Sequence, residues 1–238
     1  MSQTALIKDI FEFVLLLFSL CVHESAHAWT ASLLGDNTAR LEGRITLNPT
    51  YHIDPVGTLL VPAVIIFGPL FGFTLFSGFL IGWAKPTPVI TRNFRKIIRD
   101  ENLVTLAGPA SNLLLVGIAF AILAGLTIFL PNGQHVVMNA FLDSLGMNTH
   151  TVPQPVALLC SLAILINLSL FFFNLLPIPP LDGSHIVRNM LPYGAVQVYD
   201  RIGGGWLSWV LMFLVGGFIL SLFMGPTLAM VFAALQHL

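Results

Sequence analysis

The 238-residue chain has very few charged residues: Asp, Glu, Lys and Arg together make up 9% of it, against about 25% in a typical soluble domain. A soluble fold of this size needs polar groups to cover its surface, and this chain lacks them. The net charge of −1 provides no surface for neutralising phosphates, so no nucleic-acid partner is expected. With apolar residues at 56%, the composition predicts an integral membrane protein rather than a soluble enzyme or a disordered chain.

Cysteine is also scarce. Cys21 and Cys160 both lie within apolar runs, which excludes a disulfide framework and predicts that they pack as small apolar side chains. The first apolar run follows Asp9 and Glu12 and is interrupted by a His-Glu pair. This pattern is not that of a cleaved signal peptide.

The few charges leave long uncharged stretches, at residues 56–84, 102–142, 144–181 and 202–238. About 20 apolar residues in a helix span the hydrocarbon core of a bilayer. The predicted fold class is therefore an all-α polytopic membrane protein, a bundle of about four or five transmembrane helices. We expect one membrane-embedded domain over residues 1–238, with helices near 10–34, 56–82, 103–130, 154–176 and 206–235.

Residues 56–84 are long enough to cross the membrane, but several prolines and glycines interrupt them. They form either one kinked span or a re-entrant segment that enters and leaves on the same side. A single crossing divides the ten Lys and Arg residues 8 to 2 between the two sides, whereas a re-entrant segment divides them 9 to 1, with Lys8 alone. The positive-inside rule therefore favours the re-entrant segment, with the amino terminus outside.

The first predicted helix contains the motif H-E-x-x-H, formed by His23, Glu24 and His27. Residues i and i+4 lie on one helix face, so the two imidazoles can bind a single zinc ion. Glu24 follows His23 directly, so its carboxylate can reach a water on the metal without being a ligand, as a general base must. Ionisable groups in an apolar helix are costly, and a metal would compensate them. A buried His–Glu hydrogen-bond network is the alternative.

A catalytic zinc site needs a third protein ligand. Most other acidic residues lie in polar boundary segments, where solvent or ion pairing explains them. Asp182 stands apart, because it ends the uncharged stretch 144–181. Pro177, Pro179 and Pro180 must end a helix before it, and the extended backbone can turn its carboxylate back into the bundle. A helix-capping role at the membrane interface is the alternative for Asp182.

The early H-E-x-x-H and a late N-x-x-P-x-x-x-L-D-G motif together resemble the site-2 protease family of intramembrane zinc metalloproteases. The resemblance covers most of the chain. It implies one zinc ion held by His23, His27 and Asp182. It also implies that Glu24 is the catalytic residue and that Asn174 binds the substrate backbone. The active site would lie nearer the cytosolic face. Because no polar segment is long enough to be a soluble domain, we expect a compact member without a regulatory extramembrane module.

Two further polar residues and two segments are candidates for the site. Asn112 can hydrogen-bond across helices, either to support the site or simply to join two helices. His52 lies at a predicted membrane boundary. Its role is that of a gate, of a support for the site, or of an interface anchor. Residues 43–49 and 82–89 show strand-like alternation between prolines. They predict short β-like loops whose edge pairs with an extended substrate, or plain loops.

The sequence thus predicts a zinc-dependent endopeptidase, in the cell membrane as a multi-pass protein, that cleaves in or near transmembrane segments of other membrane proteins. A membrane metal transporter or sensor using the same ligands is the alternative. Transport needs more intramembrane polar groups and usually repeated halves, and the sequence has one cluster and no repeat. An inactive scaffold would carry a broken motif, and both motifs are intact.

Overall fold

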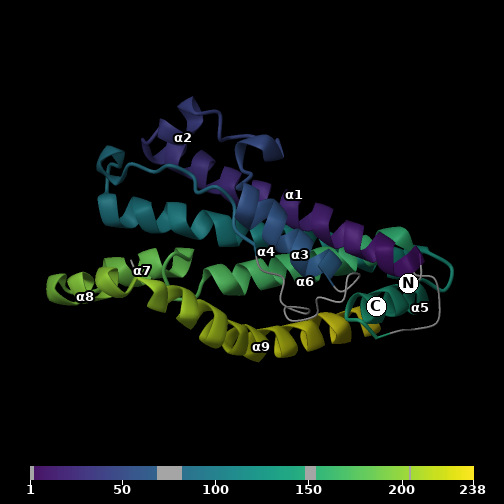
Figure 1. Cartoon of the computed structure of the whole chain (residues 1–238). Helices are drawn as coiled ribbons and strands as arrows, with labels where there is room; N and C mark the ends of the chain where they lie inside the picture. Colours follow the sequence, from purple (N-terminus) through teal and green to yellow (C-terminus); the bar gives the residue numbers. More distant parts are fainter. Residues whose placement is uncertain (1–2, 69–81, 148–153, 204) are drawn as a thin grey trace.

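The computed structural model describes residues 3–68, 82–147, 154–203 and 205–238 (Figure 1). The regular elements among these residues are all helical, which confirms the predicted all-α class. The long helices pack along one another, and most of the shorter elements lie toward the two ends of this bundle (Figure 1).

Three long helices, α1 (Gln3–Leu34), α4 (Ile97–Phe129) and α6 (Pro155–Asn174), pack against one another in the centre (Figure 1). A fourth, α9 (Trp206–Gln236), packs on α6. Among the described residues α4, α6 and most of α9 are long and apolar enough to cross a membrane. Both α1 and α4 begin earlier than the sequence indicates, because polar first turns at a membrane boundary can continue a helix into water.

The central core is apolar and closely packed, with Leu123, Phe141 and Ile164 fully buried between α4, α5 (Gly133–Ser144) and α6. The outer faces are apolar as well: Phe129 is 86% and Leu214 73% exposed. Large apolar side chains inside and outside alike are what a helix bundle surrounded by lipid requires.

The remaining described helices are short, and most of them lie toward the ends of the bundle (Figure 1). They are α2 (Thr38–Leu41), η1 (Pro49–Tyr51), η2 (Pro55–Leu60), α3 (Val61–Phe67), η4 (Thr91–Asn93), α7 (Asp182–Met190) and α8 (Tyr193–Gly203). The start of α4 lies with α2, α7 and α8 at one end, and both chain termini lie at the other, near α5 (Figure 1). The H-E-x-x-H residues of α1 lie toward the end of the bundle that carries α7.

The predicted helix over residues 56–82 is resolved as η2 followed by α3, and the question of a re-entrant turn falls on residues 69–81, outside the described part of the chain. The described residues on either side of that interval meet. The Trp83 backbone N–H donates to Gly57 O at 3.1 Å, and the Thr58 hydroxyl donates to Trp83 O at 2.7 Å. One full crossing would separate such positions by about 30 Å.

The segments predicted as β-like form no strand in the described residues. Residues 43–49 are turns and bends, and residues 82–89 are extended. Pro86 and Pro88 carry no N–H, and both lie on the same edge of this extended segment, so that edge cannot build a regular ladder.

Candidate metal centre

The site is built first on α1, which places His23 and His27 one turn apart on the face turned toward α4 and α6. Their Nε2 atoms are 3.1 Å apart, and the two residues are only 3% and 7% exposed. Burial in this apolar helix removes the water that would otherwise solvate the ring nitrogens. The pair therefore needs a partner inside the protein.

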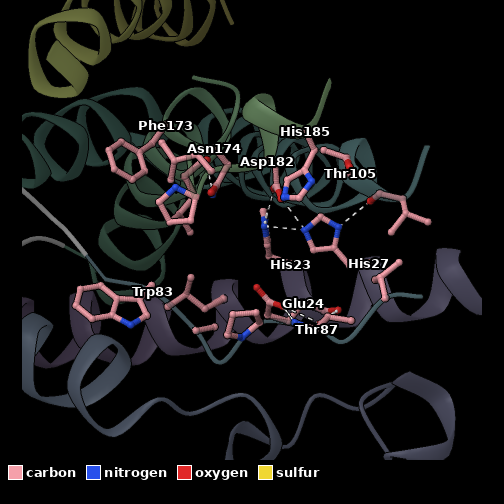
Figure 2. A pocket seen from close by; sticks show the side chains of 18 of the residues that line it. His23, Glu24, His27, Trp83, Thr87, Thr105, Phe173, Asn174, Asp182 and His185 are labelled. Carbon is pink, nitrogen blue, oxygen red and sulfur yellow. Dashed lines mark hydrogen bonds and ion pairs between the residues drawn. The ribbon is translucent and has the colours of Figure 1, made fainter. Parts of the chain in front are cut away.

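Asp182 supplies that partner from α7. Helix α6 ends at Asn174, and the proline-rich turn that follows brings Asp182 to the start of α7, as the sequence predicts. Gly183 makes the turn possible, because a Cβ at this position would collide with Leu175 O. Asp182 Oδ2 lies 3.1 Å from His23 Nε2 and 3.4 Å from His27 Nε2 (Figure 2).

The three side chains form a potential metal-binding group, in which the ligand atoms all lie within 4.8 Å of one another. Ligands that surround one tetrahedral zinc ion at about 2.0–2.2 Å are separated by about 3.3 Å from each other. The distances of 3.1 to 3.4 Å between the ligand atoms match that arrangement. Asp182 Oδ2 is also buried without a hydrogen-bond donor among the described residues. The donor set and its spacing therefore fit a zinc ion.

Helix α4 fixes the orientation of the His27 imidazole and packs against both rings. His27 Nδ1 lies 2.7 Å from Val104 O, and because a carbonyl only accepts, Nδ1 must donate and Nε2 keeps its lone pair for the metal. Gly108, one turn further along α4, faces the same rings. A Cβ at this position would collide with the Nε2 atoms of both histidines, so only glycine allows α4 to approach this closely.

Glu24 lies beside the ligands without joining them. Its carboxylate borders the same cavity of about 610 Å³ and is held by Thr87 from the extended segment 82–90 (Figure 2). The cavity is further lined by Asn174, whose amide nitrogen donates to Leu170 O at 3.0 Å. The geometry places a potential base next to a potential metal, in a space large enough for a peptide segment.

The two remaining candidates do not border this cavity. Asn112 is fully buried in α4, and neither atom of its amide has a hydrogen-bond partner among the described residues. His52 is 1% exposed; its Nε2 lies 2.8 Å from Thr46 O and 3.4 Å from the hydroxyl of Ser25, the neighbour of Glu24 in α1. For both residues, a role in supporting the site through neighbouring residues remains a prediction.

Sequence reasoning missed two contacts of the site. The carbonyl of Val104 orients His27, but a backbone group leaves no signal in the residue type. Thr87 contacts Glu24 across 63 residues of sequence. Its setting between two prolines predicts only an extended segment, so no pattern links it to the motif.

A helical membrane protein with a buried His-His-Asp centre and an adjacent glutamate defines the class of membrane-embedded metallopeptidases. Comparison with known proteins assigns the particular family. The model of peptidase family M50 matches residues 11–217. The chain belongs to this family, that of the site-2 proteases, and is a zinc-dependent intramembrane protease.

The relatives carry names that place them among the zinc metalloproteases. YwhC of Bacillus subtilis is 36% identical over 211 residues, which cover 87% of this chain and 82% of YwhC. Rip2 of Mycolicibacterium smegmatis is 32% identical over 76% of this chain, which spans only 54% of Rip2. No solved structure matches the chain. The alternative of a metal transporter or sensor is not favoured by these relatives.

Proposed function

We propose that His23, His27 and Asp182 hold the catalytic zinc ion. In this proposal Glu24 is the general base, and the substrates are membrane-embedded segments of other proteins. The observation that carries the proposal is the convergence of three ligand atoms on one cavity that Glu24 also borders.

The chemistry follows from the roles of these side chains. When bound, zinc polarises the scissile carbonyl and makes water a stronger nucleophile at neutral pH. The Glu24 carboxylate takes a proton from the attacking water, and the oxygen of that water bonds to the carbonyl carbon of the substrate. The protonated Glu24 then gives that proton to the amide nitrogen as the C–N bond breaks. The largely apolar walls of the cavity lower the effective dielectric constant around these groups, which strengthens each of these interactions.

The substrate must enter as extended backbone, because the carbonyls of a helix are tied to N–H groups four residues on. Asn174 borders the cavity, and we assign its amide to the substrate backbone. Asn112 and His52 support the site without bordering the cavity. Asn112 does so through α4, which carries Gly108 against the ligands, and His52 through Ser25, the neighbour of Glu24.

We further infer that the chain is a multi-pass protein of the cell membrane with its active site near the cytosolic face. Nine of the ten Lys and Arg residues lie in or around α2, in residues 85–99, or in α7 and α8, and these elements cluster at the end nearer the metal centre (Figure 1). Lys8 lies in α1 toward the other end. The positive-inside rule puts the basic end in the cytosol and the amino terminus outside.

The test compares the wild-type protein with Glu24→Gln after reconstitution with a membrane-protein extract. New amino termini are mapped by mass spectrometry and zinc is counted by metal analysis. We expect wild-type cleavage within apolar segments, a loss of about 10²- to 10⁴-fold in Glu24→Gln, and one zinc ion per chain in both.

Asp182→Ala is the companion variant, and it should lose zinc as well as activity, because two imidazoles alone do not complete the ligand set. Cleavage by Glu24→Gln at the wild-type rate would refute the role of Glu24. Unchanged zinc stoichiometry in Asp182→Ala would remove this residue from the site.

A further inference from the structure

Thr87 contacts the Glu24 carboxylate through two donors. Its backbone N–H lies 3.0 Å and its hydroxyl 2.7 Å from Glu24 Oε2 (Figure 2). The hydroxyl is also 3.1 Å from the Glu24 backbone carbonyl, so its single proton has two acceptors on the same residue. We propose that Thr87 is a positioning residue for the general base, which binds Oε2 and leaves Oε1 to the attacking water.

The N–H of Thr87 has a fixed direction because the segment around it is anchored on both sides. Before it, the Trp83 and Lys85 N–H groups donate to Gly57 O at 3.1 Å and His52 O at 2.8 Å. After it, the Ile90 N–H donates to Asp36 Oδ2 at 2.6 Å. In extended backbone every second N–H points to the same side, so Trp83, Lys85 and Thr87 share one direction.

The contacts with Thr87 restrict the conformational freedom of the Glu24 side chain. A glutamate side chain has several rotatable bonds, and in a cavity of about 610 Å³ it has room to turn away from the metal. A general base works only within hydrogen-bond reach of the proton it removes. Two donors on one carboxylate oxygen select a single orientation, and a displacement of about 1 Å can reduce a rate by about 10²-fold.

This positioning role of Thr87 rests on the proposed function, because Thr87 affects catalysis only if Glu24 is the general base. It also assigns the hydroxyl a task that a merely structural threonine would not have. Thr227 provides the comparison: it lies in α9 and does not border the cavity, and its hydroxyl donates to Phe223 O at 2.8 Å within the helix.

The kinetic test uses Thr87→Val, which keeps the shape and the N–H but removes the hydroxyl, with Thr87→Ser and Thr227→Val as controls. The probe is a synthetic fluorophore–quencher peptide that spans a cleavage site mapped with the wild-type protein. We expect Thr87→Val to lower kcat about 10- to 100-fold with KM and zinc content unchanged. Both controls should stay within about twofold of the wild type, because serine restores the hydroxyl and Thr227 lies outside the cavity.

A wild-type kcat in Thr87→Val would overturn the proposal while leaving the proposed function intact. So would a rise in KM alone, which would make Thr87 a substrate contact, or a loss of zinc, which would make it structural. If Glu24→Gln also cleaves this peptide at the wild-type rate, the proposed function fails, and the role of Thr87 fails with it.

A second measurement tests the contact independently of activity. Amide hydrogen exchange is compared between zinc-loaded wild type and Glu24→Ala in detergent. Loss of the carboxylate acceptor should increase exchange at Thr87 by about tenfold or more and leave the Trp83 amide, which donates to Gly57, unchanged. Equal protection of the Thr87 amide in both proteins would show that Glu24 does not hold this segment, and would overturn the proposal.

Discussion

At the scale of single residues, the metal centre depends as much on an absent side chain as on its ligands. Gly108 lets α4 lie directly against the two imidazoles. Val104, one turn earlier, then comes close enough for its carbonyl to accept from His27 Nδ1 at 2.7 Å. A larger residue at position 108 would separate α1 from α4 and loosen both the ligands and their orientation.

Gly108→Ala should therefore abolish or strongly weaken zinc binding. The added methyl group collides with both Nε2 atoms, and the rings must leave the positions that the metal needs. Zinc per chain, measured by metal analysis after purification, should fall well below one. Gly117→Ala is the matched control in the same helix, because a Cβ at that position meets nothing within 4 Å. Equal zinc content in the two variants would contradict this account of Gly108.

At the scale of elements, the loop after α1 organises the segment that reaches Glu24. Asp36 is fully buried and accepts four hydrogen bonds, two from Thr38 and one each from Ile90 and Asn93. Burial raises the pKa of the Asp36 carboxyl, but these hydrogen bonds outweigh it and hold the pKa below its ordinary value of 3.8. The charged carboxylate is therefore part of what joins the end of α1 to residues 90–93.

Asp36→Asn should lower the melting temperature at neutral pH, because one acceptor oxygen becomes an NH₂ group facing other donors. Each hydrogen bond to a charged group contributes about 1.5–3 kcal/mol. A lowered folded-state pKa stabilises the protein above the unfolded value of 3.8, and this contribution is lost as the pH falls through the folded value. Thermal unfolding in detergent should therefore show a large difference at pH 7 that shrinks below pH 4.

Glu42→Gln is the control for this comparison, because Glu42 is half exposed and pairs with Arg44 only at 3.7 Å. Arg44 is buried but keeps its hydrogen bond to Tyr51 O in this variant, and a long contact with a half-exposed carboxylate contributes little to stability, so the melting temperature should stay close to that of the wild type. A pH-independent difference between Asp36→Asn and the wild type would show that the charge of Asp36 is not what stabilises the loop.

At the scale of the whole molecule, the charges are sorted along the bundle. Nine of the ten basic residues lie toward the end with α2, α7 and α8, whereas Lys8 and the chain termini lie toward the other (Figure 1). The contact between Trp83 and Gly57 brings together the two sides of the interval that holds residues 69–81. This contact and the 9-to-1 division of basic residues favour the same topology.

Cysteine labelling in intact cells tests this orientation. The native Cys21 and Cys160 are buried, so they give a low background. Arg95→Cys and Asn132→Cys place thiols at exposed positions on opposite ends of α4. A membrane-impermeant maleimide should label Asn132→Cys from outside and reach Arg95→Cys only after the membrane is opened. The reverse pattern would place the active site on the outer side.

The extent to which the sequence predicts the fold and the site differs between parts of the molecule. The long helices follow from uncharged apolar stretches, although α1 and α4 begin six or seven residues earlier than the predicted 10 and 103. The start of α4 is basic and polar, and hydropathy cannot distinguish a helix in water from a loop. The sequence predicts residues 82–89 as β-like; they are extended and donate two backbone hydrogen bonds, but they form no strand, because Pro86 and Pro88 remove donors from one edge.

By itself, the sequence determined the environment and the chemistry of this protein. The scarcity of charge required a membrane, and two short motifs supplied the ligands and the base, because ligand chemistry depends on residue type and local spacing. Only the tertiary structure decided how the groups meet. It brought Asp182 to within 3.4 Å of both histidines, set Gly108 against them, and laid Thr87 on Glu24. These contacts depend on helix packing between residues 63 to 159 positions apart, and no local pattern records them.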